Sequence, residues 1–553
     1  MSHTITIRCK NTGRSHKVPA GFNLEQVYDM LELNLPHGPM AAKVNNKVEG
    51  LHYTLFGDKD VEFIDVTSAS GLRTYTRSLF FILYKAVRDL FPEARIRIDI
   101  SVSNGYYCRL DVPGGVTAEI VSELRQRMRE IVDAKIPYHR ITAPTDEVIN
   151  LFHEHGQEDK ARLLRGYGSL YTHYYTLDGL PDYFYGSLLI HTGQIYLFDI
   201  MPFDEGLLLR IPDPHNPDQL QPLRQQEKMF EVYREHHRWQ DLLGVSTIGE
   251  FNEVISKGYS SDLINVGEAL QEKKISRLAD RIAEHPNIQL ILVAGPSSSG
   301  KTTFSKRLSI QLMACGLHPI PISIDDYFVD RVKTPLDESG NYDFENITAI
   351  NLELFNQQMN ALLRGEEVEL QRYDFPTGRS LKSGRRVRMK QGDLIILEGN
   401  HALNPVLTEQ IPSEVKFKIY TSALTSILLD YHNYIPTTDN RMLRRIVRDY
   451  KYRGYTALET LRRWPSVKKG EEKWIFPYQE EADVIINTSL LFELSALRNE
   501  ALQLLDQVPE HEPEYSEAYR LKKFLQYLKP VSTRGLPPTS LLREFVGGST
   551  FKY

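Results

Sequence analysis

The sequence predicts an α/β protein whose main sheet, in residues 287–489, consists mostly of parallel strands. Short apolar runs alternate with helical patterns through that stretch, which is typical of a parallel sheet covered by helices. A turn rich in glycine and serine also joins the first apolar run to an amphipathic segment. With 553 residues, the chain has room for about three to five domains, so further units are expected on both sides.

Residues 1–66 predict a small unit of the ubiquitin-like, or β-grasp, type. Residues 4–9 alternate between polar and apolar side chains, as a half-buried strand does. Asn23 and Gln26 have the spacing of a capping box, so a short helix is expected to begin there. Further strands are expected at residues 44–48 and 61–66.

Residues 67–213 predict an α+β unit. A helix is expected over residues 73–90, where apolar side chains share one face, and a second helix over residues 116–134. The alternating residues 96–100 predict a strand. The proline-rich run 211–217 cannot continue a helix or a central strand, so a boundary is expected there.

Two more segments complete the predicted organisation. Residues 214–286 are expected to form a helical connector. The strands of the α/β unit are expected at residues 288–294, 320–324, 394–397, 415–420 and 484–486. Residues 490–553 predict a C-terminal tail that begins as a leucine-rich helix and ends in a segment containing glycine and serine.

Composition excludes several classes of protein. Hydrophobic residues make up 41% and charged residues 25% of the chain, as in an ordinary globular protein. No apolar run approaches the roughly 18 residues of a membrane helix, and the first residues lack a signal-peptide pattern, so a cytoplasmic protein without membrane contact is expected. The three scattered cysteines cannot build a disulfide framework. The net charge of −6 argues against non-specific nucleic-acid binding by the whole chain.

The glycine-rich turn is the strongest motif of the sequence. It has the form G-x-x-x-x-G-K-T between a predicted strand and a predicted helix, the pattern of a phosphate-binding P-loop. In such a loop the backbone N–H groups and the helix N-terminus bind phosphate, the lysine contacts the β- and γ-phosphates, and the threonine hydroxyl can ligate Mg²⁺. The predicted nucleotide-binding residues are Gly295, Pro296, Ser297, Ser298, Ser299, Gly300, Lys301, Thr302 and Thr303.

Carboxylates follow two of the neighbouring predicted strands. Asp325 lies at the end of the strand after the P-loop helix, where a kinase needs a base for the hydroxyl proton of the acceptor. Glu398 ends a later apolar strand, which suits a residue near the water shell of Mg²⁺. Asp325 is therefore predicted to be catalytic and, with Thr302 and Glu398, to lie on the metal side.

A helix rich in arginine is the third element of the predicted site. Its guanidinium groups repel one another unless anions lie nearby, and the triphosphate is such an anion. We therefore predict that Arg444 acts in catalysis with Lys301, and that Arg441, Arg445 and Arg448 bind the nucleotide. The sequence lacks the Asn-Lys-x-Asp guanine-binding motif of switch GTPases after a core strand, and it lacks an Asp-Glu-x-Asp helicase motif, so a small-molecule kinase is favoured.

These motifs, in this order, resemble the uridine kinase/phosphoribulokinase family over residues 288–489. The resemblance implies ATP-dependent transfer of phosphate to a nucleoside hydroxyl, with Mg²⁺. It makes Tyr373 and Phe375 the aromatic wall of the acceptor pocket, and it places a ribose-contacting carboxylate at Glu345 or, with a local shift, at Asp343. Where uridine kinases carry a histidine that contacts the pyrimidine, this chain has Gly378.

The first 213 residues resemble the N-terminal part of threonyl-tRNA synthetase, a TGS domain followed by the domain that carries editing. The metal-binding positions of that editing site correspond here to Arg77, Phe81, Phe184 and Leu188. An arginine and three apolar residues cannot hold Zn²⁺, so we expect no zinc and no editing.

Together these features predict a uridine- or cytidine-type kinase with a small nucleoside or sugar acceptor. The alternative is a nucleotide-gated regulator of RNA or ribosomes, with little kinase turnover, that contacts RNA through the N-terminal half. An oligomer is compatible with either.

Overall fold

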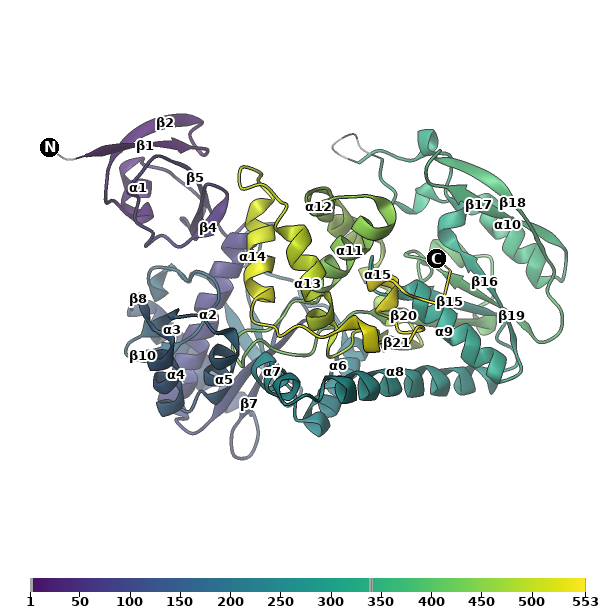
Figure 1. Ribbon diagram of the computed structural model, residues 1–553, viewed down its shortest axis with the longest axis horizontal. Coiled ribbons are helices and arrows are strands. Elements are labelled where there is room, and N and C mark those ends of the chain that lie inside the picture. The colour runs from purple at the N-terminus through teal and green to yellow at the C-terminus, as the bar shows by residue number, and fades with distance from the viewer. Residues whose placement is uncertain (1–2, 338–339, 341, 553) are drawn as a thin grey trace.

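The computed structural model describes residues 3–337, 340 and 342–552. Figure 1 places the small N-terminal unit at one end of the long axis and the large parallel sheet at the other, with the C-terminal helices between them. In the described part of the chain, no helix combines the length and the apolar character that crossing a bilayer requires.

The N-terminal unit is a five-stranded mixed sheet with the order β2-β1-β5-β3-β4, packed on helix α1 (Leu24–Met30). The capping box predicted at Asn23 and Gln26 is present at the start of α1. β1 and β5 run parallel in the middle of the sheet, as the predicted β-grasp arrangement requires. The strands are β1 (Thr4–Cys9), β2 (Arg14–Pro19), β3 (Ala41–Val44), β4 (Lys47–Glu49) and β5 (Lys59–Ile64).

The second unit has the predicted α+β character. Its buried central helix α2 packs on a four-stranded sheet of order β11-β12-β7-β6, while a three-stranded sheet of order β10-β9-β8 lies beside it. The helices are α2 (Ala69–Leu90), α3 (Ala118–Asp133), α4 (Thr145–Glu154) and α5 (Glu158–Tyr167). The strands are β6 (Arg95–Val102), β7 (Gly105–Asp111), β8 (Tyr138–Pro144), β9 (Tyr171–Leu177), β10 (Leu180–Asp182), β11 (Asp199–Phe203) and β12 (Gly206–Arg210).

The predicted connector begins as a hairpin before it becomes helical. β13 (Pro212–Asp213) pairs with β14 (Asn216–Leu220), so the expected boundary after residue 213 falls inside this hairpin. Proline is accommodated there because the ribbon has only two strands and both are edges. The helices that follow are α6 (Glu227–Leu243), α7 (Ile248–Ser256) and α8 (Ser260–Ala283).

The α/β unit is built on an entirely parallel sheet of order β16-β19-β15-β20-β21. All five strands lie where the apolar runs predict them. They are β15 (Leu290–Ala294), β16 (His318–Ser323), β19 (Asp393–Glu398), β20 (Lys416–Ser422) and β21 (Val484–Asn487). The helices are α9 (Lys301–Ala314), α10 (Leu352–Leu363), α11 (Thr437–Arg453) and α12 (Ala457–Trp474), and an antiparallel hairpin pairs β17 (Val368–Asp374) with β18 (Arg379–Val387).

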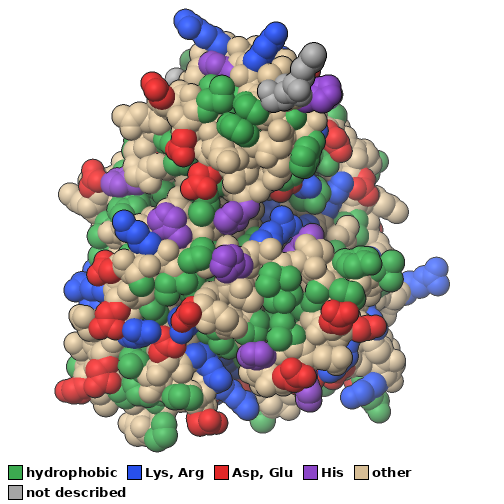
Figure 2. Space-filling view, turned by 90° about the vertical axis from the view of Figure 1, so that its left-hand side faces the viewer, with side chains coloured by type: hydrophobic (Ala, Val, Ile, Leu, Met, Phe, Trp, Pro, Cys, Tyr) green, Lys and Arg blue, Asp and Glu red, His purple; other side chains and the backbone are tan. Residues whose placement is uncertain are grey.

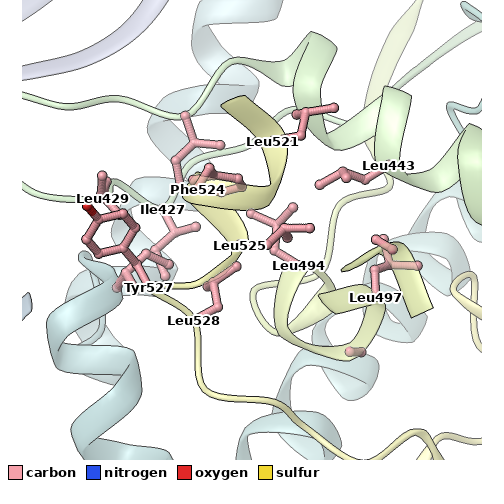
Figure 3. Close-up of a cluster of buried hydrophobic side chains, with 14 of the residues drawn as sticks. Ile427, Leu429, Leu443, Leu494, Leu497, Leu521, Phe524, Leu525, Tyr527 and Leu528 are labelled. Carbon is pink, nitrogen blue, oxygen red and sulfur yellow. The ribbon is translucent and has the colours of Figure 1, made fainter. Parts of the chain in front are cut away.

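The C-terminal segment is an integral part of the fold. Its helices are α13 (Glu493–Leu505), α14 (Tyr515–Leu525) and α15 (Arg543–Val546). Leu494 and Leu497 of α13, and Leu525 of α14, meet Leu443 of α11 in one buried cluster (Figure 3). α14 also contacts β4 of the N-terminal unit, so the C-terminal segment joins the two halves of the protein.

Candidate active site

The predicted P-loop connects β15 to α9, and its backbone conformation explains its glycines. A Cβ atom at position 295 would lie 2.4 Å from the carbonyl oxygen of Thr421, so Gly295 leaves room for the neighbouring strand. Gly300 has φ of 80°, which favours glycine, and Ser298 also lies in the left-handed region. In P-loops, turns of this kind direct backbone N–H groups toward a phosphate bound at the N-terminus of the following helix.

Three arginines of α11 donate hydrogen bonds to the P-loop. Arg441 donates to the carbonyl oxygen of Ser297 at 2.9 Å, and Arg444 donates to that of Ser298 at 3.2 Å. Arg445 donates to the hydroxyl of Ser297 at 2.8 Å. None of these three bonds uses a backbone N–H group of the loop. Within the protein, the Ser297 N–H donates to Glu471 at 2.9 Å and the Ser299 N–H donates to the Pro296 carbonyl at 3.1 Å.

The positive charge of α11 is balanced inside the protein. Buried carboxylates from other elements form ion pairs with it: Glu471 of α12 pairs with Arg441, and Glu493 of α13 pairs with Arg444 at 2.6 Å. The expectation that the triphosphate balances this charge is therefore wrong for Arg441 and Arg444, because carboxylates distant in sequence do so.

The prediction that Arg444 is catalytic is also corrected. All three of its guanidinium nitrogens donate to Glu493, Thr488 or the Ser298 carbonyl, and only 1% of the residue is exposed. This geometry assigns Arg444 to positioning the P-loop. The arginines whose charge acts on Asp325 are instead Arg448 and Arg453 at the end of α11, and Arg453 was not predicted.

Asp325 lies in the short helical turn Ile324–Tyr327 directly after β16, on the P-loop side of the sheet. The residue has surface exposed to solvent, but protein surrounds its carboxyl group, as in a cleft, and partly buries it. This burial raises the pKa of the Asp325 carboxyl, and the charges of Lys301, Arg453 and Arg448 lower it. The next residue, Asp326, accepts the N–H of Tyr373 at 3.3 Å and so fixes the turn to β17.

Carboxylates surround the P-loop lysine. Burial lowers the pKa of Lys301, whereas the charges of Glu398, Asp325, Glu544 and Glu345 raise it. Glu398 ends β19, next to β15, and accepts the Thr302 hydroxyl at 3.3 Å. Burial and the negative charges of Asp325 and Glu544 raise the pKa of Glu398 to about 7, against the lowering by Lys301 and Thr302. A further cation is the natural partner of such a crowded set of acids.

Magnesium fits this set of donors. No group of three or more His, Cys, Asp or Glu side chains in the described residues forms a ready metal site. Mg²⁺, however, is commonly held by one or two carboxylates together with water and substrate phosphates. The hydroxyl of Thr302 and the carboxylates of Glu398 and Asp325 are oxygen donors of the required kind beside the phosphate cradle.

The two candidates for the ribose carboxylate have different surroundings. Glu345 accepts a hydrogen bond from Asn400 at 3.0 Å and acts electrostatically on Lys301, so it belongs to the acidic set. Burial and the charge of Glu471 raise the pKa of Glu345 to about 7. Asp343 accepts the backbone N–H of Glu345 and stabilises the turn. The local geometry therefore favours Glu345.

Tyr373 and Phe375 form part of an aromatic cluster. Their ring centroids lie 5.0 Å apart in an edge-to-face contact, and Phe328 packs on Tyr373 at 5.5 Å. Tyr373 is buried, whereas Phe375 is 54% exposed and available to a ligand. Gly378 lies nearby with φ of 69°, and a Cβ atom there would lie 2.8 Å from atoms of Arg331, so a histidine at this position would be strained.

One residue of the site carried no signal in the sequence. Glu544 of α15 accepts the hydroxyl of Thr303 at 2.7 Å and the Thr303 N–H at 3.3 Å. These donors lie in the first turn of α9, where a P-loop binds phosphate. Glu544 lies 241 residues from Thr303, so only the packing of the C-terminal segment brings the two together.

The structure shows the surroundings of the four residues that were aligned with the metal-binding positions of the synthetase editing site. Phe81, Phe184 and Leu188 are buried in the core of the second unit. Arg77 donates to the Ser187 carbonyl at 3.0 Å.

Comparison with known proteins separates the same two regions. A threonine–tRNA ligase of Acetivibrio thermocellus is 25% identical over 182 residues, which are 33% of this chain and 29% of that enzyme. Another, from Methylobacillus flagellatus, is 27% identical over 34% of this chain and 30% of its own length. The N-terminal half carries this similarity, and the chain spans less than a third of these ligases.

The α/β unit has kinase relatives. A uridine kinase of Halobacterium salinarum is 31% identical over 196 residues, which are 35% of this chain and 77% of that enzyme. The solved structure of a possible uridine kinase from Bacillus stearothermophilus is 20% identical, with a TM-score of 0.27, and covers 39% of this chain and 98% of that one. The model of the phosphoribulokinase/uridine kinase family matches residues 290–491. Through this region, with its P-loop, its two strand-end carboxylates and its arginine helix, the chain belongs to the phosphoribulokinase/uridine kinase family of ATP-dependent kinases.

Proposed function

We propose that this protein transfers the γ-phosphoryl group of ATP to a hydroxyl of a nucleoside of the uridine or cytidine type. The observation that carries the proposal is the position of Asp325 just after β16, at the same edge of the parallel sheet as the P-loop, with one strand, β19, between β16 and the P-loop strand β15; the charge of Lys301 acts on its carboxyl. That arrangement puts a proton acceptor next to the phosphate cradle. The similarity to a uridine kinase supports the choice of acceptor.

In the proposed reaction, the P-loop amides and Lys301 hold the β- and γ-phosphates of ATP. Asp325 accepts the proton of the attacking hydroxyl, a bond forms between that oxygen and the γ-phosphorus, and the bond to the bridging oxygen of ADP breaks. Mg²⁺, held by Thr302 and Glu398 with Asp325 alongside, would neutralise phosphate charge. The charges of Arg448 and Arg453, which both also form ion pairs with Asp449, act on the Asp325 carboxyl and would stabilise the charge that develops.

The acceptor pocket is proposed from the residues around this centre. Glu345, oriented by Asn400, would bind ribose hydroxyls, and the exposed ring of Phe375 would lie against the base. Because Gly378 offers no side chain to the pyrimidine, base selectivity should be weaker than in enzymes that carry a histidine there.

We also propose the domain division 1–66, 67–213, 214–286, 287–489 and 490–553, and a cytoplasmic location.

The experiment is a turnover assay with ATP and a panel of nucleosides, sugar phosphates and RNA, with Asp325→Asn as the test variant. A general base contributes about 10²–10⁴-fold, so kcat should fall by that factor while ATP binding is retained. Asp326→Asn is the matched control, because an amide oxygen can still accept the N–H of Tyr373. Near-normal turnover of Asp325→Asn would refute its role as the base.

The rival function is a nucleotide-gated regulator that contacts RNA. Glu544 favours this rival function, because its carboxylate accepts hydrogen bonds from the Thr303 N–H and hydroxyl, which a phosphate would otherwise accept. In the same panel, stimulation of ATP hydrolysis by RNA without any phosphorylated small molecule would support the regulator and count against the kinase.

A further inference from the structure

A second cavity, of about 550 Å³, lies at the junction of the N-terminal half and the C-terminal helices. Its walls come from β4, α2, β8 and β9, and from α14. Figure 2 faces this side of the molecule, where Lys and Arg side chains gather in a recess below the small N-terminal unit. The volume is within the range of small-molecule sites.

Positive charge dominates the lining of this cavity. The only carboxylate among the lining residues is Glu49. The basic lining residues are Lys47, Arg73, Arg77, Arg140, Arg520 and Lys523. Such an excess of cations around a concave, partly desolvated space attracts an anion.

Half of these cations already have acidic partners. Lys47 pairs with Glu49 at 3.1 Å, Arg73 pairs with Glu517, and Arg520 pairs with Asp439 at 2.6 Å. The charge of these three groups is therefore largely compensated within the protein.

The other three cations have no acidic partner among the described residues. Arg77 donates to a backbone carbonyl and lies 5.6 Å from the ring centroid of Tyr185. For Arg140 and Lys523, the residues that the structure describes provide neither an ion pair nor a hydrogen bond. Burial, and then the charges of Arg140 and Arg77, lower the pKa of Lys523 to about 8, against the raising effect of the Glu49 charge, so the neighbouring cations outweigh the one carboxylate.

Aromatic rings line the space next to these cations. Tyr171 is 63% exposed and lies on β9, the strand that also carries His173. Tyr519 of α14 lies across the cavity, with the Lys47 ammonium 4.6 Å from its ring centroid. Rings beside cations suit a ligand that combines an aromatic base with a phosphate.

We propose that this cavity is a second ligand site, separate from the P-loop, and that it binds a small phosphorylated nucleoside. In this site, Arg77, Arg140 and Lys523 hold the phosphate, and Tyr171 or Tyr519 stacks on the base. The proposal concerns binding alone, so it does not depend on the kinase activity proposed above.

The cavity is in physical contact with the kinase unit. Arg520 lines the cavity and binds both carboxylate oxygens of Asp439, at 2.6 and 2.8 Å. Asp439 lies in the first turn of α11, the helix whose arginines hold the P-loop. The opposite face of α14 is anchored to α11 through the buried cluster of Figure 3. A ligand that orders α14 would therefore act on an element of the active site.

The test is calorimetric binding to the full-length protein carrying Lys301→Ala, which weakens the P-loop as a competing site. The probes are the four common 5′-nucleoside monophosphates, inorganic phosphate and a 5′-phosphorylated RNA tetranucleotide. We expect at least one monophosphate to bind with a stoichiometry of one and tighter than inorganic phosphate. Arg140→Ala and Lys523→Ala should each weaken that binding at least tenfold.

The matched control is Arg129→Ala, which removes an exposed cation from α3 outside the cavity. It should leave binding unchanged. Arg140 is exposed, so its replacement preserves the fold even if Lys523→Ala does not, and melting curves verify this. The proposal is overturned if no monophosphate binds, if binding survives both cavity variants, if inorganic phosphate binds equally well, or if only the RNA binds.

Discussion

Replacement of Glu544 by glutamine is the sharpest test of how this active site takes up ATP. The carboxylate accepts both donors of Thr303 in the first turn of α9, and it acts on the charges of Lys301 and Glu398. A phosphate that binds the same amides must displace Glu544 or lie beside it. Glu544→Gln removes this negative charge and keeps the size of the side chain.

The magnitude follows from the geometry. Glu544 lies 2.7 Å from the Thr303 hydroxyl, so a phosphate oxygen that shares this donor would lie within about 4 Å of the carboxylate. Two unit charges at that distance repel by about 4 kcal/mol at an effective dielectric constant of about 20. Movement of α15 and screening by salt reduce this value. We therefore expect ATP to bind at least about tenfold more tightly, which corresponds to about 1.4 kcal/mol.

The assay is direct titration of ATP by calorimetry, in parallel with Glu123→Gln. Glu123 is an exposed residue of α3, so this control changes the net charge equally but far from Thr303 in the sequence and in a different unit. Unchanged or weaker ATP binding by Glu544→Gln would show that the carboxylate does not compete with phosphate, and the reasoning would fail.

Two further predictions concern the acids and the arginine helix. Because the pKa of Glu398 is raised to about 7, its carboxylate form is lost as the pH falls through that value, so Mg²⁺-dependent turnover should fall below pH 7. Glu398→Gln should lower turnover at every pH and flatten this pH profile. The measurement is the Mg²⁺ dependence of kcat/KM across the pH range. A profile that is unchanged in Glu398→Gln would assign the titration to another group. Glu493→Ala leaves the buried guanidinium of Arg444 without its partner and should lower the free energy of unfolding by about 3–5 kcal/mol in urea denaturation. The double variant Arg444→Met, Glu493→Leu should recover much of that loss, and equal stability of all three proteins would contradict the role of this pair.

Local sequence patterns predict the backbone elements of the active site well. The five parallel strands lie at the apolar runs, because a strand buried on both faces requires consecutive apolar residues. The P-loop, Asp325 and Glu398 were predictable for a related reason. The carboxyl ends of parallel strands meet at one edge of the sheet, so a residue just after such a strand has a known place.

The partners of the arginines could not be predicted in this way. Glu471, Glu493 and Glu544 lie on helices whose patterns indicate only an exposed or a buried face. Which carboxylate reaches which guanidinium depends on how α11, α12 and α13 pack together. For that reason the sequence suggested an arginine helix directed at phosphate, whereas Arg441 and Arg444 hold the P-loop through its carbonyl groups.

The sequence by itself determined the order of the units, the parallel sheet, the phosphate-binding loop and the carboxylates that follow its strands, because each depends on the periodicity of side chains or on contacts between near neighbours. Only the tertiary structure decided that Glu544 reaches Thr303, that α14 closes a basic cavity against the N-terminal half, and that Arg520 connects this cavity to α11. These features join residues that are 81 to several hundred positions apart. Their contacts arise from the packing of whole elements, which no local pattern encodes.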